Sequence, residues 1–428
     1  MPKGFFYLIS AQFTSGLADH ALLILGIAFL TEQGYPGWWA PLLKFSFTLS
    51  YVLLAPVMGP LSDAVPKQRL MAAMNALKLV GVAFFFSGLH PVVAFALVGL
   101  AASAYAPAKY GLVTETVSPQ QLVQANAWLE VSVVMAVILG TASGGVLLGI
   151  HQWDAMLTLN QGLCSALSIP VTTQLASPLL LVILIYALAA ALNWGIPHSD
   201  AVYPQQSIHP VAMCKNFWRS NLLLWRDPMG RISLSVTTLF WGVGAVIQFA
   251  VLLWAQQTLN IPLEKGAYLQ AIVAVGVIAG AGLAGYKFKL ESAKKVLPLG
   301  VVLGLLLPAI AFTHSLYLAI PLMIIVGLVG GVLMVPMNAL LQHRGFELLT
   351  AGRSIAVQGF NENASVLLLL GIYSALLAVQ MPLVWVMTLL GVTLALGMAA
   401  LTWSAFHNAP RGPSAQSNGE SLNPLTKH

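Results

Sequence analysis

Apolar runs long enough to cross a bilayer follow one another along this chain. They lie near residues 5–30, 42–61, 70–89, 91–112, 122–150 and 175–197, and then near 232–257, 267–290, 296–314, 316–342, 353–378 and 382–404. A helix of roughly 20 apolar residues spans the hydrocarbon core of a membrane. The pattern therefore predicts an all-α integral membrane protein with twelve transmembrane helices. The runs are continuous rather than alternating, which excludes a transmembrane β-barrel.

A polar segment divides the runs into six and six. Residues 198–231 contain three prolines and four cations, a composition typical of a linker. We therefore predict an N-terminal six-helix half over 1–197, a cytoplasmic linker over 198–231 and a C-terminal six-helix half over 232–404. Residues 405–428 are too polar to bury a core, and we predict a disordered cytoplasmic tail there. Residues 151–174 form a long external connection to which we assign no role.

Composition agrees with a lipid environment. Of the 428 residues, 58% are hydrophobic and 7% charged, against about 25% charged in soluble domains. Nearly all lysines and arginines outside the predicted spans fall in loops and termini on one side of the membrane: Lys3, Lys67, Arg69, Lys215, Arg219, Arg226, Arg231, Lys287, Lys289, Lys294, Lys295, Arg344, Arg353, Arg411 and Lys427. The loops on the opposite side contain almost no lysine or arginine except Lys265. Basic loops face the cytoplasm, so both termini are predicted there, and the net charge of +6 needs no nucleic-acid partner.

A weak internal repeat relates the two halves. Asn126 and Glu130 in the fifth run match Gln358 and Glu362 in the eleventh, each pair placing an amide four residues before a glutamate. Internal repeats of this kind are characteristic of secondary transporters. The pattern favours a duplicated transporter.

Ionisable residues inside the predicted spans are the first candidates for function, because a charge in hydrocarbon is costly unless it is paired or hydrated. They are Asp19, Lys78, Lys109, Glu130 and Glu362. Asp19 is the strongest candidate because it lies in mid-span. Lys78 shares a polar helix stripe with a neighbouring asparagine, so a structural role is favoured for it. Lys44 is near a span end, where its ammonium can reach the interface.

A cavity that offers both signs of charge suits a zwitterionic cargo such as a phosphoethanolamine head group, whose ammonium needs a carboxylate and whose phosphate needs a cation. The amides of Asn126, Gln358 and Asn361 could bind glycerol or phosphate oxygens. The alternative is structural: ion pairs that fix helices together and amides that hydrogen-bond between helices.

Enzyme signatures are absent from the sequence. No H-x4-D acyltransferase motif, GxSxG or GxxxxGK[ST] occurs, so a lipid acyltransferase is disfavoured. Cys164 and Cys214 fit neither a disulfide framework nor a metal site. We expect no enzyme activity, cofactor or metal.

The segment from Gly59 through Asp63 and Lys67 to Arg69 fits the pattern G-x-L-[AS]-D-x3-[KR]-x-[RK]. Glycine permits a tight turn, and the aspartate can cap a neighbouring helix end. The segment resembles the loop signature of the major facilitator superfamily, where the loop stabilises a closed cytoplasmic face. The resemblance implies the fold of that superfamily, with two six-helix halves.

More specific blocks cover nearly the whole chain. They are Ala11–Phe13, Ala18–Leu23, Ala104–Gly111, Asn126 with Glu130, Leu239–Gly242, Val335–Gly345 and Ala356–Asn363. They resemble the bacterial lysophospholipid transporter family, LplT. This implies import of lysophospholipids, chiefly lysophosphatidylethanolamine, from the outer to the inner leaflet of a Gram-negative inner membrane. A cytoplasmic-side acyltransferase would re-acylate them there, and the transporter is expected to be a monomer.

By position, the resemblance places Asp19, Lys109, Asn126, Glu130 and Glu362 along the cavity or its gates. The chain departs from the family at His20, where asparagine is frequent, and at Gln248, where an arginine is usual. Another cation, with Lys109 as the candidate, would have to pair with Asp19 in place of that arginine.

We expect alternating access by two rocking halves, with the lysolipid reaching the cavity sideways between helices. The alternative is a proton-coupled exporter of small amphiphiles or drugs, because the fold does not fix the cargo. Asp19 or Glu362 could then couple proton and substrate.

Overall fold

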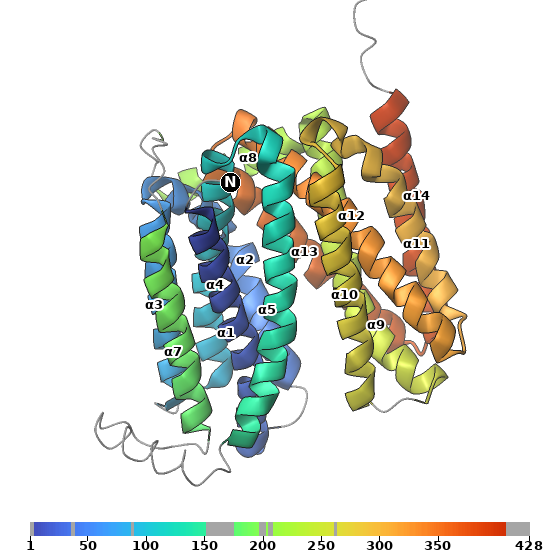
Figure 1. Cartoon of the computed structure of the whole chain (residues 1–428), viewed down its shortest axis with the longest axis horizontal. Helices are drawn as coiled ribbons and strands as arrows, with labels where there is room; N and C mark the ends of the chain where they lie inside the picture. The colour runs from blue at the N-terminus through green and yellow to red at the C-terminus, as the bar shows by residue number, and fades with distance from the viewer. Residues whose placement is uncertain are drawn as a thin grey trace, which may run out of the picture.

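The computed structural model describes residues 4–35, 39–86, 90–150, 175–196, 203, 209–260 and 263–407 (Figure 1). Regular structure in these residues is helical. The first group of long helices is α1 (Phe5–Glu32), α2 (Trp39–Ala64), α3 (Lys67–Phe86), α4 (Pro91–Thr116), α5 (Leu122–Ile150) and α7 (Ala176–Leu192). The second group is α9 (Pro228–Thr258), α10 (Leu263–Lys287), α11 (Leu297–Ala311), α12 (Leu316–Leu348), α13 (Ala351–Ala378) and α14 (Leu383–His407). Short 3-10 turns occupy Pro119–Gln121, Asn193–Gly195 and Leu290–Val296.

These helices follow the predicted apolar runs and confirm an all-α, multi-pass membrane protein. Eleven described helices are long and apolar enough to span a membrane. The remaining predicted span corresponds to α3, which is less apolar because it carries Lys67, Arg69 and Lys78 in 20 residues. The predicted connection at 151–174 and nearly all of the predicted tail lie outside the described residues.

Local signals explain several helix starts. The His90 ring accepts a hydrogen bond from the Val92 amide at 3.2 Å at the start of α4. The Asp227 carboxylate accepts one from the Gly230 amide at 2.8 Å at the start of α9. Both helices also begin with proline, whose fixed φ suits the first turn and whose missing amide hydrogen costs nothing there.

The predicted linker contains a helix that the pattern of apolar runs does not indicate. This helix is α8 (Pro210–Arg226), and it packs against α2, α9 and α13. Its apolar residues are spaced for one helical face but form no long run, so a search for spans overlooks it.

Each group packs tightly within itself. Leu22 and Phe85 are fully buried in the first group, as are Trp254 and Met323 in the second. Small residues allow the closest helix contacts: a Cβ built on Gly280 of α10 would lie 2.1 Å from the Leu328 carbonyl oxygen of α12. Close backbone approach at small residues is the usual basis of helix association in lipid.

The two groups meet at the end of the bundle where α2 and α4 finish and α5 and α13 begin, here called the joined end. A Cβ on Gly285 of α10 would lie 2.5 Å from the Ala127 Cβ of α5. A Cβ on Gly59 of α2 would lie 3.0 Å from the Ala356 Cβ of α13. From the joined end, α5 and α10 diverge along their length (Figure 1).

Candidate functional site

Asp19, in the middle of α1, forms an ion pair with Lys78 of α3. The Lys78 ammonium lies 2.8 Å from each carboxylate oxygen, and the Tyr186 hydroxyl of α7 donates to Oδ1 at 2.6 Å. The Lys78 side chain is 2% exposed and that of Asp19 is 20% exposed. The carboxylate therefore keeps a solvent-accessible edge, while the ammonium depends on its protein partners.

Two further polar groups complete this network. The Lys78 ammonium also donates to the Ser15 hydroxyl at 3.0 Å, and that hydroxyl donates to the Asn75 carbonyl oxygen at 2.8 Å. Lys78, rather than Lys109, is thus the cation that pairs with Asp19. The sequence stripe of Asn75 and Lys78 marked this position, but its partner lies 59 residues away and could not be identified from spacing.

Lys109 lies on α4 and is buried. Its ammonium donates to the Gln12 side-chain oxygen of α1 at 2.9 Å and lies 4.2 Å from the centre of the Tyr110 ring. Glu130 of α5 is also buried. Lys109 and Glu130 are therefore two buried groups of opposite charge, and the hydrogen-bond partner of Lys109 is the neutral Gln12.

The repeated amides of the two halves converge on α12. Asn126 and Gln342 exchange reciprocal side-chain hydrogen bonds of 2.9 Å, and the Gln358 amide donates to Asn338 at 3.0 Å. Asn338 and Gln342 are one helical turn apart. These two residues were not among the predicted site residues, although an amide pair four residues apart in an otherwise apolar run is a sequence signal for them.

Gln358 and Glu362 lie together on α13. The Gln358 amide donates to the Glu362 carboxylate at 2.8 Å. The side-chain oxygen of Gln358 is buried and has no hydrogen-bond partner among the described residues. A half-buried carboxylate beside an unused acceptor oxygen is suited to bind a cation with N–H donors.

Asn361 lies apart from this pair. Its amide donates to the Asn221 side chain of α8 at 2.8 Å, and its oxygen accepts from the Trp225 indole at 3.2 Å. Asn361, one of the predicted substrate-binding residues, is therefore placed against α8, where it fixes that helix to α13.

The loop motif spans the joined end. Asp63 accepts hydrogen bonds from the Thr350 hydroxyl and from the Gly352 amide, the latter at 2.9 Å. These two residues are at the start of α13, so the carboxylate also meets the positive end of the helix dipole. This contact joins the two groups directly.

The cations of the motif differ in their surroundings. Lys67 lies 3.7 Å from Asp63 and 2.7 Å from Glu115 of α4. Arg69 is exposed. The Tyr203 hydroxyl donates to Glu115 at 2.5 Å, and burial together with this bond raises the pKa of Tyr203.

Lys44 lies on the side of α2 that faces α13. Tyr51, Ala55 and Gly59 follow it at helical spacing on one face. Gly59 packs against α13, and Tyr51 lies 3.9 Å from a Cβ built on Gly359. The Lys44 side chain is exposed. Lys44 is thus an accessible cation on the face of α2 that packs against α13 further along the helix.

An ion pair also fixes the start of α9. Arg344 of α12 donates to both carboxylate oxygens of Asp227, at 2.7 and 3.0 Å. The hydrogen bond from Arg344 holds the pKa of Asp227 below its usual range.

In the described part of the chain, no three His, Cys, Asp or Glu residues lie close enough together to bind a metal ion.

Comparison with known proteins identifies the family. Residues 5–357 match the Major Facilitator Superfamily. The lysophospholipid transporter LplT of Yersinia enterocolitica is 38% identical over 385 residues, covering 90% of each chain. That of Salmonella arizonae is 38% identical over 400 residues, covering 93% of this chain and 95% of its own. The chain belongs to the LplT family of the major facilitator superfamily.

Solved structures with low sequence identity share the fold of this LplT family member. The human organic anion transporter MFSD10 matches with a TM-score of 0.71 at 13% identity, covering 95% of this chain and all of its own. The transporter FucP in its outward conformation matches with a TM-score of 0.71 at 16% identity, covering 94% and 97%. The predicted major facilitator fold is therefore confirmed, and the relatives are transporters, not enzymes.

Proposed function

We propose that this protein moves lysophospholipids, chiefly lysophosphatidylethanolamine, from the outer to the inner leaflet of a Gram-negative inner membrane. The observation that carries the proposal is the presence of accessible groups of both signs inside an apolar helix bundle. Glu362 and Asp19 offer carboxylates, and Lys44 offers an ammonium. Relatives with 38% identity bear the name of lysophospholipid transporters, which supports the same cargo.

The head group would use both kinds of site. Its ammonium would bind the Glu362 carboxylate and the unpartnered oxygen of Gln358. Its phosphate would pair with Lys44 on the facing side of α2. Lys109 is a less direct phosphate ligand because it is buried behind Gln12. The predicted substrate residues Asn126 and Glu130 would line the deeper end of the path.

Transport would proceed by alternating access. With the joined end on the cytoplasmic side, the structure corresponds to a state closed toward the cytoplasm. Opening that side requires Asp63 to leave the start of α13 and Asn126 to separate from Gln342. Both contacts are hydrogen bonds that water can replace, so each costs little to break once solvent enters.

Lateral access would suit a lysolipid. Where α5 and α10 diverge, a single acyl chain could stay in the apolar bilayer while the head group passes between the halves. A diacyl lipid would have to bring a second chain through the same space. We further propose that both termini are cytoplasmic, that the protein acts as a monomer, and that an acyltransferase on the cytoplasmic side consumes the product.

The test is uptake of labelled lysophosphatidylethanolamine by vesicles with and without this protein, alongside a diacyl phosphatidylethanolamine and a cationic dye. Selective, protein-dependent movement of the lysolipid is the expected result. Dye movement driven by a pH gradient without lysolipid movement would overturn the proposal. It would support instead the proton-coupled exporter, for which the accessible carboxylates Asp19 and Glu362 are the motivating observation.

A further inference from the structure

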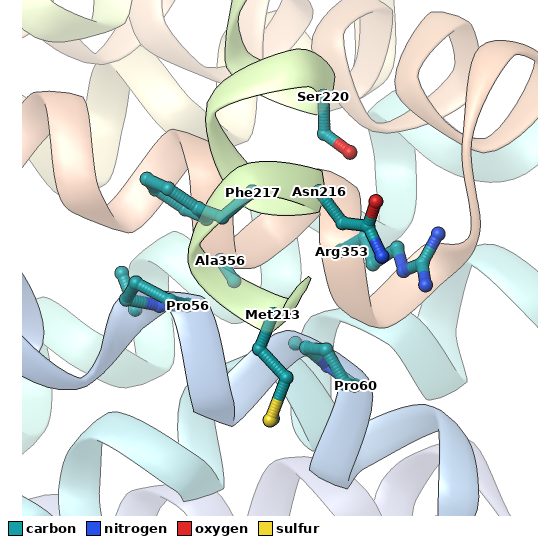
Figure 2. Close-up of a pocket in the computed structure, with 10 residues that line it drawn as sticks. Pro56, Pro60, Met213, Asn216, Phe217, Ser220, Arg353 and Ala356 are labelled. Atoms are coloured by element: carbon teal, nitrogen blue, oxygen red, sulfur yellow. The ribbon is translucent and has the colours of Figure 1, made fainter. Parts of the chain in front are cut away.

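Helix α8 lies against the outside of the contact between α2 and α13. Met213, Asn216 and Phe217 of α8 cover Pro56 and Pro60 of α2, with α13 alongside (Figure 2). Asn361 of α13 also hydrogen-bonds to Asn221 and Trp225 of α8. One side of α8 is therefore packed against both groups.

The depth of α8 follows from the residues it covers. Ala55, Pro56, Gly59 and Pro60 line this contact, and α2 ends at Ala64. At 1.5 Å per residue, the covered stretch lies about 6–14 Å before the end of the helix. Because α2 spans the membrane, α8 lies beside its last turns, near the boundary between the acyl chains and the head groups.

One exposed stripe of α8 is apolar. Val211, Trp218 and Leu222 follow one another at spacings of seven and four and are 70%, 54% and 47% exposed. The opposite face is buried by Phe217 and Leu224. An apolar stripe beside a buried face needs an apolar surrounding, and at this depth the acyl boundary of the bilayer supplies it.

The neighbouring exposed stripe is basic. Lys215, Arg219 and Arg226 are exposed, and Lys215 and Arg226 each lie four residues after a member of the apolar stripe. No described carboxylate forms an ion pair with these three cations. Adjacent apolar and basic stripes are the pattern of helices that lie in the surface of an anionic leaflet.

We propose that α8 is a membrane-surface helix that binds anionic lipid head groups through Lys215, Arg219 and Arg226, with Trp218 and its neighbours in the acyl boundary. The partner is the anionic leaflet itself. The inference does not depend on the transported cargo, because it rests on the exposed side of a helix that faces away from the charged interior.

Cys214 provides a probe on α8 because it is exposed and lies four residues before Trp218. The test uses the full chain with Cys164→Ser, so that an environment-sensitive fluorophore labels Cys214 alone. The protein is placed in phosphatidylcholine nanodiscs with increasing fractions of phosphatidylglycerol. We expect the emission to shift to shorter wavelength as the anionic fraction rises.

Charge variants distinguish lipid binding by the cations of α8 from attraction of lipid by the overall surface charge. The triple variant Lys215→Gln, Arg219→Gln, Arg226→Gln should need at least about fivefold more phosphatidylglycerol for the same shift, since each cation near an anionic surface contributes about this factor. The matched control is Lys287→Gln, Lys289→Gln, Lys295→Gln, which removes three exposed cations at the same end but not on α8. It should behave like the parent.

Two results would overturn the proposal. One is a parent protein whose emission does not respond to phosphatidylglycerol. The other is an equal loss of response in both triple variants, which would mean that overall surface charge, and not α8, attracts the lipid. A Trp218→Ser variant adds an independent arm: it keeps the cations and should weaken the wavelength shift by removing the apolar anchor.

Discussion

One set of variants at the Asp19–Lys78 ion pair tests both the contribution of the pair to stability and the role of Asp19 in transport. Asp19→Asn leaves the Lys78 ammonium, 2% exposed, without a counter-charge, because the Ser15 hydroxyl and the introduced amide oxygen are both neutral acceptors. An uncompensated buried charge of this kind costs about 3–5 kcal/mol. Lys78→Met leaves Asp19 with Tyr186 and a 20% exposed side chain. Because water can still reach this carboxylate, the cost should be about 1–3 kcal/mol.

The double variant Asp19→Asn, Lys78→Met removes both charges together. Its free energy of unfolding should lie within about 1 kcal/mol of the parent, because replacing a buried ion pair by apolar or neutral groups is often close to neutral. If the two sites were independent, the losses would instead add to about 4–8 kcal/mol. A loss of stability in the double variant that is much smaller than the sum of the two single losses would show that the two side chains interact.

Unfolding is followed by tryptophan fluorescence during titration with dodecyl sulfate in mixed micelles, and lysolipid uptake is measured on the same variants. The two variants that lack the Asp19 carboxylate should lose uptake if Asp19 contacts the head group. A double variant as unstable as the sum of the single variants would refute the pairing. A stable double variant with normal uptake would instead refute the functional role of Asp19.

Three other predictions follow from the site. Gly352→Ala should reduce transport while the protein still folds, because a Cβ there would lie 2.6 Å from Asp63 Oδ1 and disturb the closed joint; uptake at the parent rate would contradict this. Lys44→Gln should raise the KM for lysolipid several-fold, and Lys44→Arg should restore it; equal uptake by both would remove Lys44 from the phosphate site. Asp227→Asn should lower stability at neutral pH by about 1–3 kcal/mol through loss of the Arg344 contact. Because the folded-state pKa of Asp227 is depressed, its contribution is present above a pH of about 4 and is lost as pH falls through the folded pKa. Unfolding curves of parent and variant measured against pH should therefore converge in acid.

The sequence predicted the membrane architecture well because a bilayer imposes length and apolarity on each span separately. The runs at 91–112 and 353–378 became α4 and α13 without reference to any other part of the chain. Helix α8 was overlooked for the same reason. Its stability comes from packing on α2 and α13 and not from a long apolar run.

The chemistry of the interior was only partly accessible from the sequence. Asp19 and Glu362 stood out because charges in a span are rare. The partners of these two carboxylates could not be predicted from the sequence, because pairing depends on which helices become neighbours. The sequence favoured a structural role for Lys78 and suggested Lys109 as the partner of Asp19. In the structure, Lys78 of α3 and Tyr186 of α7 are the groups that hydrogen-bond to the Asp19 carboxylate.

The sequence by itself determined which segments enter the membrane, the division into two halves of six apolar runs, and the few residues whose charge is expensive in lipid. These are local properties, fixed by each segment's own transfer from water to hydrocarbon. The tertiary structure alone decided that Lys78 is the cation that pairs with Asp19 and that Asn361 hydrogen-bonds to α8. Such outcomes depend on helix rotation and neighbour choice, which arise from packing between segments far apart in the chain.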